Sequence, residues 1–314
     1  MDAITSLLQA VRYFADKDNC RKFMIAIRWA DGVVRCPACG SDKVTYLEKQ
    51  DRYKCYGKHP KAQFSLKVGT IFEDSPIGLD KWLPAAWLVI NCKNGISSYE
   101  LHRDIEVTQK TAWFMLQRVR LAMQTGTFNG PLSGEVEVDE TFIGGKARNM
   151  HADKRAEKIH GRGATGKAVV MGMLERGGHV RTKVVAKRNK KTLQTEIKKN
   201  VAPGSEIFSD ELLSYWGLNG EFIHQIINHA EEYVRGNVHT NGMENFWSLL
   251  KRGLNGTYIS VEPFHLFCYL DEQMFRYNYR ELTDGERFVM VLQQVVGRRL
   301  TYAELTGKTE RSQC

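Results

Sequence analysis

Hydrophobic residues recur at two spacings along the chain, and the change between them predicts where helices give way to strands. Apolar side chains three or four positions apart indicate helices within residues 1–30 and 76–125. Alternating or continuous apolar runs indicate strands at Val136–Ile143, Ala168–Leu174 and Val180–Ala186. The elements predicted after these are a helix at 190–200, strands at Glu206–Ser209 and Gln225–Asn228 with a helix at Glu211–Leu218 between them, and helices at about 240–252, 262–280 and 284–298. This succession of strands and helices is typical of an α/β domain.

Three cysteines and a histidine within residues 31–75 have the spacing of a metal site. Cys36 and Cys39 form a Cys-x-x-Cys pair, and Cys55 and His59 form a second pair after fifteen intervening residues. Four such ligands from two turns suit tetrahedral Zn²⁺, and the strand-forming stretch between them is typical of a zinc ribbon. A redox Cys-x-x-Cys would need a βαβ context, which this region lacks. The cysteines without a partner at ligand spacing are predicted to be ordinary thiols: Cys20, Cys92, Cys268 and Cys314.

The segment after residue 95 has the pattern of two short helices joined by a tight turn. Ser97 followed by Glu100 forms a predicted capping box, Glu106-Val107 forms the turn, and Thr108 can cap a second helix, Gln109–Met123. The second helix is expected to bury Ala112, Leu116 and Val119. Two helices in this arrangement indicate a DNA-reading helix-turn-helix, and the alternative is a plain helical hairpin in a core. The residues predicted to contact DNA are Gln109, Lys110, Gln117, Arg118 and Arg120 here, and Arg252 further along the chain.

Acidic residues then alternate with valines on a predicted strand. Glu135, Glu137 and Asp139 face one side of this strand, opposite Val136 and Val138. Carboxylates in such apolar surroundings are costly unless a cation neutralises them, and a divalent metal can do so.

Two later segments supply further candidates for the same site. Asp210 ends a predicted strand, while Asn241, Glu244, Ser248 and Lys251 share one face of a later helix. Three oxygen-bearing side chains from two strands and a helix can hold two Mg²⁺ ions about 4 Å apart, as in-line attack on phosphorus requires. Lys251, about two turns beyond Glu244, would place an ammonium group on a phosphate.

Composition and charge support a polyanionic partner. The 314 residues include 45 Lys or Arg against 36 Asp or Glu, a formal charge of +9. Residues 141–200 alone contain sixteen Lys or Arg and four acids, which describes either a solvated surface or the phosphate-binding side of the acidic site. No run approaches the roughly 18 apolar residues of a membrane helix, and no secretory signal is recognisable. We therefore expect a soluble protein of a reducing, cytoplasmic environment.

One motif near the basic tract resembles a nucleotide-binding loop but lacks its essential residue. Gly161–Lys167 nearly matches a Walker A sequence. Ala168 stands where a Ser or Thr would bind Mg²⁺, and a strand follows instead of a helix. An ATPase is therefore not expected.

Long sequence runs resemble the IS1595 (ISXO2-like) group of insertion-sequence transposases. The runs span about residues 20–280. In the second half they are VEVDETFIGGK, FSDELLSYWGL and HTNGMENFWSLLKRGLNGTY, and in the first half RCPACGS, YKCYGKHPKAQFSLKVGTIFEDSPIGLDKW and KNGISSYELHRDIEVTQKTAWFMLQRVR.

The resemblance implies specific roles for the acidic residues. Asp139 and Asp210 match the two family aspartates, and Lys251 matches the family lysine. The third metal ligand varies in this group within an Asn-x-x-Glu motif, so Asn241 and Glu244 are both candidates. Glu244 is favoured because a carboxylate neutralises a metal better than an amide does. His229 and His239 flank the motif and are expected only to support the ligands or to contact phosphate.

The resemblance also implies an α/β, RNase H-like catalytic domain that follows a zinc ribbon and a helix-turn-helix domain. The expected divisions are an N-terminal helical segment at 1–30, the ribbon at 31–75, the helix-turn-helix region at 76–124, a linker at 125–133, the catalytic domain at 134–260 and C-terminal helices at 261–314.

The expected activity is that of a DDE-type DNA transposase. It would bind terminal inverted repeats and target DNA as a homodimer or larger assembly, and would cleave and join strands with Mg²⁺ or Mn²⁺. The alternatives are a zinc-dependent DNA-binding regulator, a domesticated transposase without strand transfer, and an RNase H-like nuclease that does not join strands.

Overall fold

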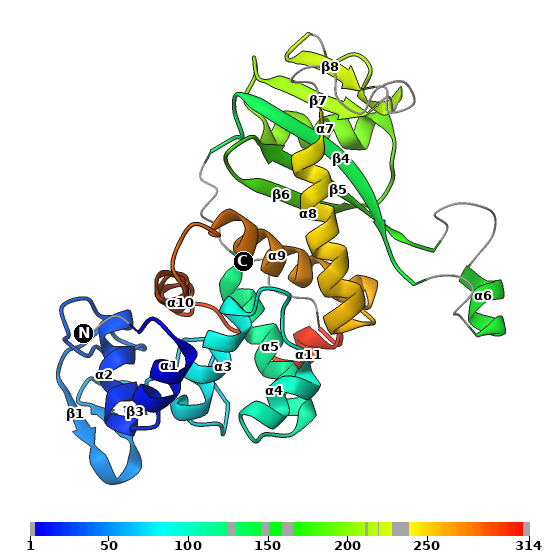
Figure 1. The fold of residues 1–314 in the computed structure, drawn as a ribbon. Coiled ribbons are helices and arrows are strands. Elements are labelled where there is room, and N and C mark those ends of the chain that lie inside the picture. Colours follow the sequence, from blue (N-terminus) through cyan, green and yellow to red (C-terminus); the bar gives the residue numbers. More distant parts are fainter. Residues whose placement is uncertain are drawn as a thin grey trace. The chain divides into compact units, whose positions relative to one another are not determined.

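The computed structural model describes residues 4–124, 130–145, 151–158, 166–210, 213–218, 220–227 and 239–309. The chain forms two compact units (Figure 1). One, the ribbon unit, consists of Met1–Gln124 and Tyr279–Cys314, and the other, the sheet unit, consists of Thr125–Asn278. The C-terminal segment 261–314 is therefore divided between the two units.

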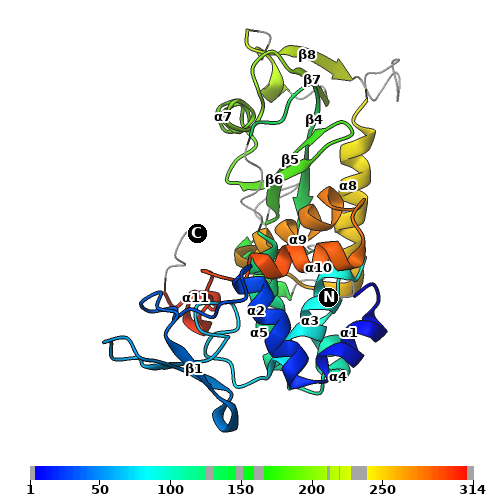
Figure 2. The same ribbon diagram turned by 90° about the vertical axis from the view of Figure 1, so that its left-hand side faces the viewer.

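The ribbon unit contains the predicted N-terminal helices and the end of the chain (Figure 2). Its aromatic core joins segments far apart in sequence, because Phe288 lies 5.9 Å from Phe14, 5.7 Å from Phe23 and 5.1 Å from Trp87 between ring centroids. The helices are α1 (Leu7–Phe14), α2 (Lys17–Arg28), α3 (Leu79–Asn91), α4 (Ser98–Asp104), α5 (Gln109–Met123), α10 (Asp284–Gln293) and α11 (Tyr302–Leu305).

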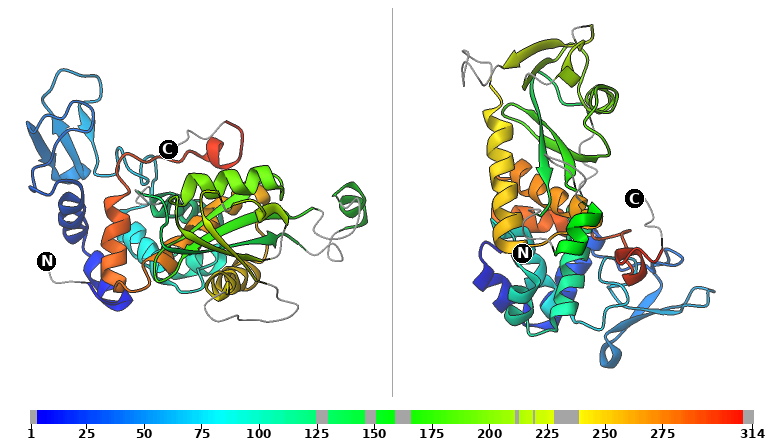
Figure 3. Two further views of the ribbon diagram at one scale, coloured as in Figure 1. Left: turned by 90° about the horizontal axis from the view of Figure 1, so that it is seen from above. Right: turned by 90° about the vertical axis from the view of Figure 1, so that its right-hand side faces the viewer.

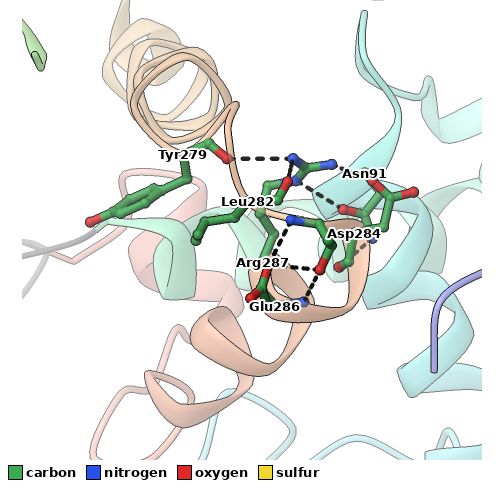
Figure 4. A network of polar contacts seen from close by, with 7 residues as sticks. Asn91, Tyr279, Leu282, Asp284, Glu286 and Arg287 are labelled. Carbon is green, nitrogen blue, oxygen red and sulfur yellow. Dashed lines mark hydrogen bonds and ion pairs between the residues drawn. The ribbon is translucent and has the colours of Figure 1, made fainter. Parts of the chain in front are cut away.

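Arg287 holds the start of α10 in place within this unit (Figure 4). Its guanidinium donates to the Leu282 carbonyl, pairs with Asp284, and lies 3.2 Å from Asn91 Oδ1 in α3. The Asn91 amide donates in return to the Asp284 carbonyl at 3.2 Å. A capping box between Thr283 and Glu286 completes this helix start.

A small antiparallel sheet carries the cysteine region, as the ribbon pattern predicts. It consists of β1 (Val44–Leu47), β2 (Arg52–Cys55) and β3 (Gln63–Phe64), in that order. Tyr53 links the three strands because its ring stacks on Phe64 and packs against Tyr46.

The predicted pair α4 and α5 is present with Ser97 and Thr108 as N-caps, and Ser97 makes its half of the predicted capping box. Ser97 accepts from the Glu100 N–H, Thr108 accepts from the Thr111 N–H, and Glu106 turns the chain with φ of 52°.

The predicted polar face of α5 is wrong for three residues, because Gln117, Arg118 and Arg120 are buried. Helix α5 packs against α3, α4 and α10, and the Arg118 guanidinium donates to the carbonyls of Glu73 and Leu300. Lys110 is exposed as predicted, and the half-buried Gln109 donates to Ser98 at 2.8 Å.

The sheet unit is built around a five-stranded mixed sheet. Its strands are β4 (Glu135–Ile143), β5 (Ala168–Glu175), β6 (Val180–Val185), β7 (Glu206–Asp210) and β8 (Ile223–Ile227). Their order is β6-β5-β4-β7-β8, antiparallel from β6 to β4 and parallel from β4 to β8. The left panel of Figure 3 shows α7 (Lys190–Asn200) on one face and α8 (Asn241–Arg252) on the other.

The helix predicted at Glu211–Leu218 is wrong, because the described residues 213–218 contain only a single 3₁₀ turn at Leu213–Tyr215. Short elements that were not predicted include α6 (Ala152–Lys158), α11, a 3₁₀ turn at Glu48–Gln50, and a π-helical turn at Gly253–Tyr258 that continues α8. Helix α9 (Leu266–Asn278) packs on β6, where the Asn278 side chain bonds both backbone groups of Val180.

Each face of the sheet has its own core, in agreement with the predicted alternation on β4. Val136 and Val138 pack toward α7, and Val170 and Leu174 pack toward α8. Gly172 allows α8 to approach β5, since a Cβ there would lie 2.2 Å from Met243 Cε and 2.6 Å from Trp247 Cζ2. The missing side chain is therefore part of how α8 packs.

We expect Gly172→Ala to destabilise the sheet unit by about 1–3 kcal/mol, the usual cost of overpacking a close-packed contact. Urea unfolding monitored by tryptophan fluorescence would measure this loss. Gly256→Ala is the matched control, because a Cβ at Gly256 meets nothing within 4 Å. Equal unfolding midpoints for the two variants would contradict the proposed role of Gly172.

Candidate functional site

Three carboxylates meet where β4 and β7 run side by side. Asp139 and Glu140 lie on β4, Asp210 ends β7, and one carboxylate oxygen from each lies within 4.8 Å of the others. The parallel register pairs Glu135 with Glu206, and the same register continued along the strands brings Asp139 beside Asp210. The two aspartates predicted to act together are thus close in space.

Asp139 is held by two donors and has an unfavourable environment for its charge. The Glu140 N–H donates to Oδ1 at 2.7 Å, and Trp247 Nε1 on α8 donates to Oδ2 at 2.9 Å. Burial raises the pKa of Asp139 most strongly, the nearby charges of Asp210 and Glu244 raise it further, and the two donors oppose the rise. A cation beside Asp139 would relieve this cost.

Glu140 is the third member of the cluster, and no role was predicted for it. Burial raises the pKa of Glu140, and the negative charges of Asp210 and Asp139 add to the rise. The Tyr215 hydroxyl and the Arg188 guanidinium oppose it. Arg188 Nη2 lies 3.3 Å from Glu140 Oε2 and 3.8 Å from Asp210 Oδ2, so one guanidinium faces two of the three carboxylates.

The other two acids of β4 are neutralised by an arginine and do not belong to the cluster. Arg176 lies 2.7 Å from Glu135 Oε2 and 3.0 Å from Glu137 Oε1. Glu137 also accepts from the Met243 N–H at 2.9 Å, which anchors the first turn of α8 on β4. His239 Nδ1 lies 3.3 Å from Glu137 Oε1, so this histidine supports the anchor. His229 lies outside the described residues.

The polar face predicted on α8 is present and exposed. Asn241, Glu244 and Lys251 are all exposed, as is Arg252. Glu244 is near enough to raise the pKa of Asp139 but lies outside the group of three carboxylates. Glu244 is therefore near Asp139, but Glu140 is the residue that completes the group of three carboxylates with Asp139 and Asp210.

The acidic cluster fits a hard divalent cation. Mg²⁺ and Mn²⁺ prefer carboxylate oxygens, and the three side chains offer such oxygens within 4.8 Å of one another. The Glu140 carboxylate is buried and faces the Arg188 guanidinium and the Tyr215 hydroxyl, so a divalent cation would stabilise its charge further.

The four predicted zinc ligands also come together. Cys36 Sγ lies 3.4 Å from His59 Nε2, and Cys39 Sγ lies 3.6 Å from Cys55 Sγ. Ligands in a tetrahedral zinc site are about 3.5–3.8 Å apart, given the usual Zn–S and Zn–N bond lengths. Gly57 fits between them, because a Cβ there would lie 3.0 Å from Cys39 Sγ. The donor set and its spacing fit Zn²⁺.

Four residues at the acidic site were missed by sequence reasoning. Glu140 adjoins Asp139, but strand alternation assigned it to the opposite face. Arg188 was only one of sixteen cations in the basic tract, and its pairing depends on the turn between β6 and α7. Tyr215 and Trp247 have uncharged side chains, so a search for acidic and basic residues does not select them. Trp247 lies one turn beyond Met243 on the helix face that packs against β5.

Both units of the chain match transposase families. Residues 131–278 match the ISXO2-like transposase domain and residues 15–57 match the transposase zinc-ribbon domain. A protein of the transposable element ISH50 in Halobacterium salinarum is 28% identical over 265 residues, which cover 79% of this chain and 86% of the relative. A transposase-like protein of Haemophilus influenzae is 32% identical over 118 residues, 37% of this chain and 93% of the relative.

Among the described residues, the helices are too short or too polar to cross a membrane. Both family matches, one in the first 57 residues and one over the sheet unit, come from the same transposase group. The chain therefore belongs to the IS1595 (ISXO2-like) family of transposases.

Proposed function

We propose that this chain is a DDE-type DNA transposase that binds the terminal inverted repeats of an insertion sequence and cleaves and joins DNA strands. The observation that carries the proposal is the cluster of Asp139, Glu140 and Asp210 on adjacent strands, with Glu244 nearby on α8. These residues would hold Mg²⁺ or Mn²⁺, which supplies charge stabilisation at the reacting phosphate when bound.

The strand arrangement supports an RNase H-like assignment for the sheet unit. Three antiparallel strands are continued by two parallel ones, and the acidic residues lie on β4 and at the end of β7. Asp139 and Asp210, which match the two family aspartates, would be one pair of ligands. Glu244 would be the third ligand after a rotation of its exposed side chain, with Asn241, three residues earlier, as the alternative.

The cations around the site suit a polyanionic substrate. Lys251 and Arg252 are exposed in the last turn of α8, and Lys251 follows Glu244 on the same exposed face. Ammonium and guanidinium groups here would hold phosphates of the DNA backbone. They would position the strand and carry no sequence information.

The ribbon unit would recognise the transposon ends. The zinc ribbon and the pair α4 and α5, as a helix-turn-helix, are the proposed DNA-binding elements. With Gln117, Arg118 and Arg120 buried, the predicted contacts that remain on α5 are Gln109 and Lys110 in its first turn, which is the end that enters the major groove in such motifs. Two ends require two active sites, so the acting form would be a homodimer or a larger assembly on the nucleoid.

A regulator that binds DNA without cutting it is the second candidate. The observation against it is the unfavourable environment of the acidic cluster, because burial raises the pKa of both Asp139 and Glu140. Carboxylates weaken phosphate binding, and a protein that only binds DNA has no use for them at this position.

We expect strand cleavage and transfer on a duplex that carries the element's own terminal repeat, in the presence of Mg²⁺. Asp139→Asn should abolish product, because an amide removes the ligand charge while keeping the shape. Glu244→Gln should also abolish cleavage, whereas Asn241→Ala should leave some. Gel separation of labelled strands measures all four proteins.

The controls separate the alternatives. Each variant should still shift the labelled duplex in a binding assay, since none of the three residues lies in the ribbon unit. Binding by the wild type without any cleavage would favour the regulator. Cleavage without joining would favour the nuclease. A stronger loss in Asn241→Ala than in Glu244→Gln would move the third ligand to Asn241.

Arg188 should compete with divalent metal for the acidic cluster. Its guanidinium faces the Glu140 and Asp210 carboxylates that would hold the metal. We expect Arg188→Gln to bind Mn²⁺ about tenfold more tightly by calorimetry, allowing for solvent screening of a partly exposed charge. Arg188→Lys retains the charge and should stay near the wild type. Equal affinity in all three proteins would contradict the competition.

The cysteine cluster should hold one zinc ion. Cys36→Ser or Cys39→Ser should release it and weaken binding to the terminal repeat, because the ribbon loses the crosslink between its two turns. Elemental analysis of the purified protein measures the zinc content. Cys92→Ser is the matched control, since Cys92 lies outside the cluster. Unchanged zinc in both cluster variants would rule out this site.

A further inference from the structure

A pocket of about 480 Å³ lies in the sheet unit where β4 ends and the chain leaves α8. Polar groups from three segments line it: Lys167 before β5, Lys251 in the last turn of α8, and Asn255 and Ser260 beyond it. With two lysines and no acidic residue among the described residues of its lining, the pocket suits an anion.

The position of Lys167 is determined by the adjacent backbone. Ile143 pairs with Ala168, so Gly144 comes opposite Lys167 at the end of the ladder. Gly144 has φ of +156°, and a Cβ there would lie 3.2 Å from Lys167 Cγ. The glycine thus lets the stem of Lys167, an exposed residue of the pocket lining, lie against the chain.

The rest of the pocket is apolar and includes an unusual residue. Leu254, Ile259 and Val261 contribute to the wall. Ile259 is 80% exposed and has φ of +61°, a strained conformation for a β-branched side chain. It follows the π-helical turn Gly253–Tyr258, a form that frequently occurs at functional sites. A ligand that covers the exposed Ile259 side chain would bury apolar surface and so offset the cost of this strained conformation.

We propose that this pocket binds one unpaired nucleotide of the DNA substrate, with its phosphate at Lys167 and Lys251 and its base against Ile259 and the apolar wall. Small-ligand pockets run from about 300 to 1,000 Å³, so the volume suits one nucleotide. A duplex does not enter, since its major groove alone is about 12 Å wide. The inference rests on the proposed function, because it takes DNA as the substrate.

The pocket lies close to the acidic cluster along two elements. Phe142, which lines it, is three residues beyond Asp139, or about 10 Å along a strand. Lys251 is one helical turn, about 6 Å, beyond Trp247, whose indole donates to Asp139. A DNA strand whose reacting phosphate lies at the carboxylates would therefore bring a nearby nucleotide to this pocket.

Binding of two matched DNA probes tests the proposal without requiring cleavage. One probe is a blunt duplex, and the other is the same duplex with its last two base pairs mismatched and 2-aminopurine at the penultimate position. In the absence of added Mg²⁺, the wild type should bind the mismatched probe roughly tenfold more tightly, the scale of one base contact. The 2-aminopurine fluorescence should change on binding, because its base leaves its neighbours.

Variants locate the effect at the pocket. Lys167→Gln removes one phosphate contact, and Ser260→Phe fills the pocket from an exposed position, so each should reduce the preference to about twofold or less and suppress the fluorescence change. Lys199→Gln, an equal loss of charge at an exposed lysine of α7, should retain both. Thermal unfolding verifies that all variants are folded.

The outcomes separate this inference from the proposed function. Binding of both probes with equal affinity by the wild type would overturn the nucleotide pocket and leave the transposase proposal intact. A preference that survives in both Lys167→Gln and Ser260→Phe would also overturn it. Failure to bind either probe, with the terminal repeat included in the duplex, would count against the proposed function as well.

Discussion

The neutralisation of carboxylates on β4 is the constraint on which the sheet unit depends. This strand lies at the centre of the sheet, with apolar packing on both faces, and carries four acids within six residues. Arg176 pairs with Glu135 and Glu137. Arg188 offsets only part of the remaining charge, because the pKa values of Asp139 and Glu140 stay raised. The acids at the start of β4 are thus paired with an arginine, whereas Asp139 and Glu140 further along the strand keep some uncompensated negative charge when ionised.

The same strand determines where α8 lies. Glu137 accepts from the N–H of Met243, and Asp139 accepts from the indole of Trp247 one turn later. Gly172 on β5 provides the space for both side chains of α8. These contacts orient the opposite face of the helix, so Glu244 and Lys251 are exposed to solvent, and Glu244 is close enough to raise the pKa of Asp139. Packing contacts made by Glu137, Gly172 and Trp247 therefore position Glu244 and Lys251, the residues proposed to bind metal and phosphate.

Local patterns predicted the elements well, because caps and periodicity depend on near neighbours. Ser97, Thr108 and the alternation on β4 are examples. The predictions that were wrong or missing concern contacts between residues far apart in the sequence. Arg118 was predicted to face DNA, yet it bonds Leu300, which lies 182 residues away in the chain. Glu140 joined the site through a register between β4 and β7 that no local pattern specifies.

The charges around this site bear on the choice between catalysis and binding alone. A protein that only holds DNA phosphates would bind them better with amides in place of Asp139, Glu140 and Asp210, and would avoid the cost of burying the acids. A metal-dependent strand transferase needs these carboxylates beside cations, because ligands for a divalent ion and contacts for the substrate phosphates must adjoin. Helix α8 carries the exposed Glu244 and Lys251, so one element would supply both a metal ligand and a phosphate contact, and this is the physical reason to prefer the catalytic proposal.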